Sequence, residues 1–177
     1  MERVRQTSFT PAEHDKYRTM QEVYSRVGAV ASWWASFEME IDLAALRLAG
    51  LNASAIAMCF TAHIMGAGRK LDAYVAVAKE RGSTKFAAEL EAMIKDTASM
   101  TERRNRIVHD MWIVESPELI GRFEVTARRK LRSLVVPVSL PALSQCMADI
   151  AAHSTAFRNL DLQIQAEVGT SPDKPAP

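Results

Sequence analysis

Several common signs of function are missing from this sequence of 177 residues. Its formal net charge is only +1, so overall charge points to neither a nucleic acid nor a membrane as its partner. Its two cysteines, Cys59 and Cys146, form no closely spaced metal or redox pair, as is typical of a reducing compartment. No apolar stretch of the secretory type follows the first residues. We therefore expect one globular, cytoplasmic domain.

Motifs for metals, phosphates and membranes are also scarce. The four histidines lack the spacing of zinc ligands, and no glycine-rich phosphate loop follows a predicted strand. The stretch 43–68 is low in charge, but Arg47 and a break at Gly50 make it two buried helical segments rather than a membrane span. We therefore predict no metal, no cofactor and no membrane partner.

The hydrophobic pattern predicts a mostly helical protein. Apolar residues recur at steps of three and four, which predicts four helices, at 11–49, 55–81, about 84–109 (capped by Ser83 or Thr84) and 141–168. Three short β-favouring runs between the last two helices predict a hairpin or small ribbon: 112–114, 123–126 and 134–138.

These elements predict a mainly all-α fold, an up-down four-helix bundle over residues 11–168 with a small β-hairpin inserted between the third and fourth helices. Residues 1–10 show no period and are predicted to form a flexible arm. Residues 169–177 have the composition of a disordered tail.

The most distinctive chemical cluster lies in 102–112, at the predicted end of the third helix. Arg104, Asn105 and His109 are all side chains that can handle a phosphate group. Arg104 also falls on the apolar stripe of its helix, where a lone charge needs an acidic partner, a cavity or a subunit interface. Five residues rotate a helix by about 140°, but a long arginine and a bend at the helix end allow Arg104 and His109 to converge.

A structural reading of the same cluster stays open. Glu38 and Asp42 share one face of the first helix, because they are four residues apart. They are either an acid/base pair or, more in keeping with their position, a source of the ion-pair partner that Arg104 or Arg106 needs. In that reading His109 only caps its helix.

The predicted hairpin and the helix before it are locally basic. These positive charges either line an RNA-binding surface or protect an exposed edge strand from pairing. The RNA-binding candidates are Arg103, Arg122, Arg128, Arg129, Lys130 and Arg132, with Arg106 beside them.

The segment from Arg104 to His109, late in the third helix of the predicted bundle, resembles the Arg-polar-x-x-x-His motif of the HEPN (higher eukaryotes and prokaryotes nucleotide-binding) superfamily. Many of its members are metal-independent endoribonucleases of toxin, phage-defence or RNA-processing systems, with a composite site at a homodimer interface. Others are non-catalytic scaffolds or nucleotide-binding modules that act with an antitoxin or a nucleotidyltransferase. Met111 stands where some toxin members carry a tyrosine.

The resemblance implies a role for each residue of the motif. His109 corresponds to the acid/base, Arg104 to the group that stabilises the phosphate, and Asn105 to a residue that orients either one. The chemistry fits these residue types, because a histidine can exchange a proton near neutral pH and an arginine fork can bind a phosphate through two hydrogen bonds.

Overall fold

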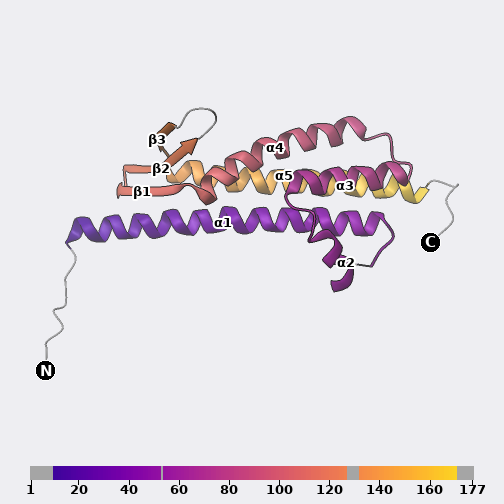
Figure 1. Ribbon diagram of the computed structural model, residues 1–177, viewed down its shortest axis with the longest axis horizontal. Coiled ribbons are helices and arrows are strands. Elements are labelled where there is room, and N and C mark those ends of the chain that lie inside the picture. The colour runs from indigo at the N-terminus through magenta and orange to yellow at the C-terminus, as the bar shows by residue number, and fades with distance from the viewer. Residues whose placement is uncertain (1–9, 53, 127–131, 171–177) are drawn as a thin grey trace, which may run out of the picture.

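The computed structural model describes residues 10–52, 54–126 and 132–170, which form five helices and a small antiparallel sheet (Figure 1). The helices are α1 (Pro11–Leu48), α2 (Ala55–Thr61), α3 (Ala67–Glu80), α4 (Ala87–His109) and α5 (Leu140–Thr170). The strands are β1 (Met111–Ser116), β2 (Leu119–Thr126) and β3 (Arg132–Pro137), in the order β1-β2-β3. The prediction of a mainly helical protein with a small β insertion is confirmed.

Helix α1 begins where the sequence predicts. The Thr10 side chain accepts a hydrogen bond from the Glu13 backbone amide, and the Glu13 carboxylate accepts one from the Thr10 amide, which together form a capping box. Pro11 follows at the first helical position, where its missing N–H costs nothing. The apolar stripe of α1 is buried or partly buried from Met20 to Leu48, where it packs into the hydrophobic core.

The single helix predicted over 55–81 is wrong. The chain forms the short α2, leaves helical geometry after Thr61, and starts α3 at Ala67. Gly66, just before α3, has φ +85°, a conformation that a helix does not contain and that glycine adopts most easily. The apolar residues keep a helical period across this break, so the pattern alone did not reveal it.

The break sets the direction of the helices that follow. In the hydrogen bonds between α1 and α5, the residue numbers increase in the same direction along both helices, so the two helices are parallel. The bonded pairs are Arg26 with Ser144, Glu40 with Ser154, and Arg47 with Asp161. Two contacts of α1 with α3 also advance together, Asp42 with Lys70 and Leu48 with Arg81. Contacts of α4 with α5 run in opposite order, Arg103 with Asp149 and Thr97 with His153.

Helices α1, α3 and α5 are therefore parallel to one another, and α4 is antiparallel to them. The predicted up-down alternation fails between α1 and α3. After the turn that ends at Gly66, α3 runs in the same direction as α1. From α3 to α5 the alternation holds.

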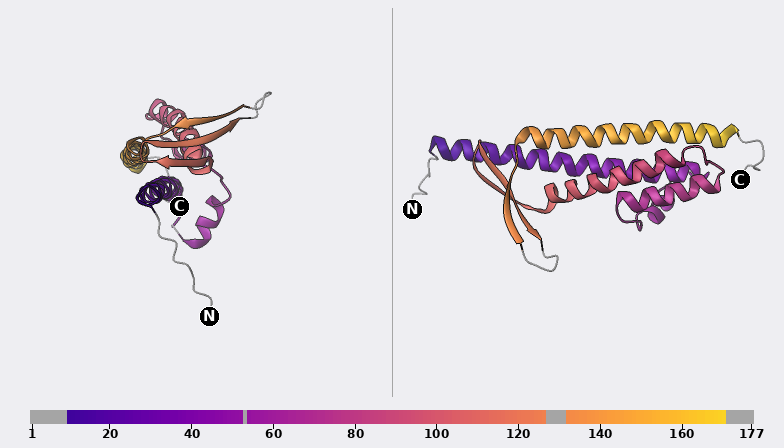
Figure 2. Two further views of the ribbon diagram at one scale, coloured as in Figure 1. Left: turned by 90° about the vertical axis from the view of Figure 1, so that its left-hand side faces the viewer. Right: turned by 90° about the horizontal axis from the view of Figure 1, so that it is seen from above.

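Helix α4 and the sheet meet at one end of the molecule. The predicted cap of the third helix at Ser83 or Thr84 is wrong, since α4 begins only at Ala87 and the Ser83 hydroxyl donates instead to Glu167 of α5. At its other end, α4 passes directly into β1. The strands run past the start of α5 and project beyond the helices (Figure 2). None of the helices in the described residues is long and apolar enough to span a membrane.

Two segment ends differ from the sequence prediction. Helix α5 continues to Thr170, so Gly169 and Thr170 belong to a helix and not to the predicted tail. Thr10 is the cap of α1, as its place before Pro11 predicts, although it also falls within the arm predicted over 1–10. The remainder of both predicted termini, 1–9 and 171–177, lies outside the described residues.

Candidate active site

The three residues of the motif converge at the C-terminal end of α4. The Arg104 Nη1 atom lies 3.0 Å from the Asn105 Oδ1 atom and 3.5 Å from the His109 Nε2 atom. The second distance is long for a hydrogen bond, but it places both groups within reach of one small anion. Asn105 and His109 are exposed, and they share a helix face because they are four residues apart.

Arg104 is partly buried, as its place on the apolar stripe of α4 predicted. Three earlier stripe residues, Leu90, Met93 and Thr97, are buried, and Arg104 is half-buried one turn beyond Met100. Its Nε atom is buried and has no hydrogen-bond partner among the described residues. A buried donor without a partner costs about 1–3 kcal/mol, so the fold retains this arginine at a cost.

Helix α1 does not supply the carboxylate that Arg104 was expected to need. Glu38 accepts a hydrogen bond from Trp34 Nε1 at 2.8 Å, and Asp42 pairs with Lys70 of α3. Both residues were predicted to support the motif, and within the described residues neither forms a hydrogen bond or ion pair with Arg104 or Arg106. The sequence could not show which cation Asp42 would meet, because the position of α3 depends on the break before Gly66.

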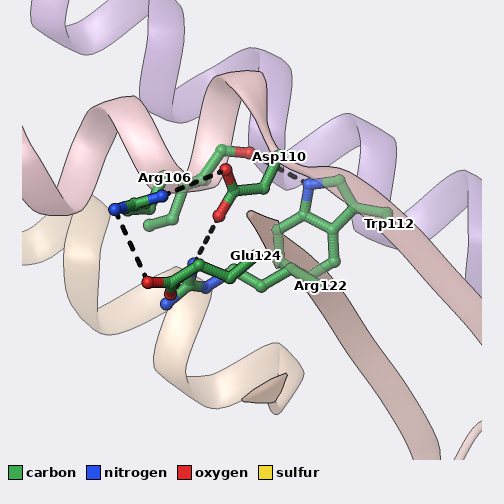
Figure 3. Close-up of polar contacts among 6 residues, drawn as sticks. Arg106, Asp110, Trp112, Arg122 and Glu124 are labelled. Carbon is green, nitrogen blue, oxygen red and sulfur yellow. Dashed lines mark hydrogen bonds and ion pairs between the residues drawn. The ribbon is translucent and has the colours of Figure 1, made fainter. Parts of the chain in front are cut away.

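Arg106 belongs to a closed ring of four charges that joins α4 to the sheet (Figure 3). Its guanidinium lies 3.8 Å from Asp110 and 3.5 Å from Glu124. Arg122 lies between the same two carboxylates, 2.5 Å from Asp110 and 3.0 Å from Glu124. Two arginines and two carboxylates alternate around the ring, so it carries no net charge.

The ring fixes the backbone next to His109. Asp110 ends α4 with an extended conformation, and its side chain is held by both arginines. Close by, the Trp112 Nε1–H group donates to the Ile107 carbonyl at 2.9 Å, which satisfies one of the free carbonyls at the helix end (Figure 3). The His109 backbone is therefore anchored from both sides.

Sequence reasoning missed Asp110 and Glu124, although each left a signal. Asp110 follows Arg106 by four residues, which is the spacing of a helical ion pair. Glu124 follows Arg122 by two, so both point to the same face of β2. What the sequence does not contain is the contact between α4 and this face of the sheet.

Two of the predicted RNA-binding arginines already pair with carboxylates of the protein, which leaves them less free to bind a phosphate. Arg103 pairs with Asp149 at 2.6 Å, and Arg122 is enclosed in the ring. Arg132, the first residue of β3, is exposed. Arg128, Arg129 and Lys130 lie outside the described residues.

A second histidine, His153 of α5, is partly buried and bonds to the middle of α4 rather than to the motif. Its Nε2 atom is 2.7 Å from the Thr97 Oγ1 atom, and its ring meets the Phe37 ring edge-on at 5.2 Å. His153 is therefore bonded within the fold. Burial lowers the pKa of His153 below the ordinary value of 6.5, against a weaker opposite influence of Asp96.

The lowered pKa of His153 predicts a dependence of stability on pH. Below about pH 6.5 the unfolded chain binds a proton at this histidine more readily than the folded chain does, so the free energy of unfolding should decrease as the pH falls. Urea unfolding between pH 7.5 and 5 should show a flatter dependence for His153→Gln than for the wild type. His63→Gln, at an exposed histidine, is the control. An unchanged slope in His153→Gln would contradict the assignment.

Comparison of the chain with models of protein families, with curated proteins and with solved structures gives no match. In the described residues, no group of three or more histidine, cysteine and acidic side chains is placed to hold a metal ion. The interpretation of the site therefore depends on its own geometry and on the short motif.

Proposed function

We propose that this protein is a metal-independent endoribonuclease of the HEPN type, with Arg104, Asn105 and His109 as its catalytic residues. One observation carries the proposal: the guanidinium of Arg104 is directed to the side chains of both Asn105 and His109. The rival arrangement, in which Arg104 is paired with Glu38 inside the core, does not occur.

The arrangement suits attack of a ribose 2′-hydroxyl on the adjacent phosphorus. In the proposed reaction, the 2′-oxygen forms a bond to phosphorus and the 5′-oxygen of the next nucleotide leaves. One histidine accepts the 2′-hydroxyl proton and a second donates a proton to the leaving oxygen. Arg104 stabilises the charge on the non-bridging oxygens. The products are a 2′,3′-cyclic phosphate and a 5′-hydroxyl.

The need for a second proton-transfer group supports a homodimer in this proposal. Each chain carries one copy of the motif, and two copies across a two-fold axis would supply both histidines. Asn105 and His109 are exposed in the single chain, as an interface site requires. We propose α1, α3, α4 and α5 as the four helices of the HEPN-like bundle. A role in a toxin or phage-defence system, with an antitoxin or nucleotidyltransferase partner, is part of the same proposal.

The test is cleavage of a labelled single-stranded RNA by the purified protein in excess EDTA, with analysis of the product ends. We expect cleavage with cyclic phosphate and 5′-hydroxyl ends, from a protein that sediments as a dimer. RNA or nucleotide binding without cleavage would instead support the alternative, a non-catalytic HEPN-like module. Products with 5′-phosphate ends would contradict the proposed chemistry.

A further inference from the structure

A groove of about 850 Å³ lies between α4, strands β2 and β3 and the start of α5. Its apolar lining comes from all of these elements: Ile107, Ile120, Val136, Val138 and Leu143. Its charged lining consists of three arginines and three carboxylates: Arg103, Arg106, Arg122, Glu102, Glu118 and Glu124. A groove of this size accepts a ligand of a few hundred Å³, and this one offers both apolar and charged contacts.

Arg106 is the arginine of the ring with hydrogen-bonding capacity to spare. Its distances of 3.5 and 3.8 Å to Glu124 and Asp110 are those of an ion pair, and its guanidinium makes no hydrogen bond within the described residues. Arg122, in contrast, donates to both carboxylates at 2.5 and 3.0 Å. Arg122 therefore makes the hydrogen bonds to the two carboxylates, whereas Arg106, which lines the groove, is held to them by charge alone.

The groove borders the motif along α4. His109 follows Arg106 by three residues, which on a helix is a rise of about 4.5 Å and a turn of about 60°. The motif residues do not line the groove, but along α4 they alternate with Arg103, Arg106 and Ile107, which do. An RNA strand that places one phosphate at His109 would bring the neighbouring nucleotide to Arg106.

We propose that this groove binds the nucleotide next to the scissile phosphate, with Arg106 on the phosphate of that nucleotide and its base against the apolar lining. The inference rests on the proposed function, because it takes single-stranded RNA as the ligand. An unpaired base is required, since only an unstacked base can enter such a groove. Glu102 and Glu118 provide acceptors for amino groups of the base.

Binding of a labelled 2′-O-methyl RNA, which cannot be cleaved by 2′-hydroxyl attack, tests the phosphate contact. Arg106→Gln should weaken binding about tenfold, the loss of one charge-assisted hydrogen bond. It should also reduce the slope of log affinity against log salt by about 0.7, the change expected for one phosphate contact on a single strand. Arg69→Gln, at an exposed arginine of α3, is the matched control. An unchanged slope and affinity in Arg106→Gln would overturn the proposal.

Filling the groove tests the base contact. Ala142 lines the groove on the exposed side of α5, whereas the exposed Ala148 of the same helix does not. Ala142→Trp should weaken binding of the same RNA about tenfold, and Ala148→Trp should leave it unchanged. Circular dichroism melting confirms that both variants are folded. Equal affinities for the two tryptophan variants would overturn the proposal.

The two proposals fail separately. If the wild type cleaves RNA in EDTA while Arg106→Gln and Ala142→Trp bind RNA as the wild type does, the groove assignment is wrong and the proposed activity stands. If binding depends on the groove but no RNA is cleaved, the groove is an RNA-binding site and the proposed activity is wrong.

Discussion

Replacing His109 with alanine should reduce the rate of RNA cleavage by about 10²- to 10⁴-fold, the usual contribution of a positioned acid/base group. His109 is exposed, and its only hydrogen-bond partner among the described side chains is the Arg104 guanidinium, so its removal should leave the melting temperature nearly unchanged. Single-turnover cleavage in EDTA and a thermal melt of the same sample measure the two effects.

The matched control for this variant is His63→Ala, because His63 is also exposed and lies away from the motif. We expect His63→Ala to cleave RNA at the wild-type rate. A His109→Ala protein that cleaves as fast as the His63→Ala protein would remove His109 from the mechanism.

The second prediction concerns Arg104, where activity and stability should change in opposite directions. Arg104→Met keeps a long side chain but removes the guanidinium. Cleavage should decrease by at least about 10²-fold, since the group that stabilises the phosphate charge is lost. The free energy of unfolding should increase by about 1–3 kcal/mol, because a buried nitrogen without a partner is removed.

Arg47→Met is the matched control, because the same substitution there should be destabilising. Arg47 donates to the buried Asp161 carboxylate at 3.0 Å, so its loss weakens a buried hydrogen-bonded charge. Urea unfolding of both variants compares the two arginines directly. If Arg104→Met lost stability as Arg47→Met does, Arg104 would be a structural residue.

Much of the fold follows from local signals in the sequence. The start of α1 is encoded by Thr10, Pro11 and Glu13, and the core stripe of α4 by its spacing of three and four. The failure over 55–81 has a simple cause. The spacing of apolar residues indicates which side chains are buried, but not where the backbone turns. Here the helical spacing continues across a turn that depends on the backbone conformation of Gly66.

The candidate site was predictable in its residues but not in its surroundings. The convergence of Arg104 and His109 follows from the reach of arginine at a helix end, which the sequence allows one to anticipate. The ring around Arg106 could not be anticipated in the same way, because Glu124 comes from a strand. Its contact depends on how the sheet packs against α4.

The central claim is that this chain cleaves RNA through the 2′-hydroxyl group of its substrate. The most direct measurement compares two RNAs of the same sequence in EDTA, one unmodified and one with 2′-O-methyl groups throughout. The proposed mechanism predicts that the unmodified RNA is cut to products with 2′,3′-cyclic phosphate ends and that the methylated RNA remains intact. Cleavage of both RNAs, or of neither, would contradict it.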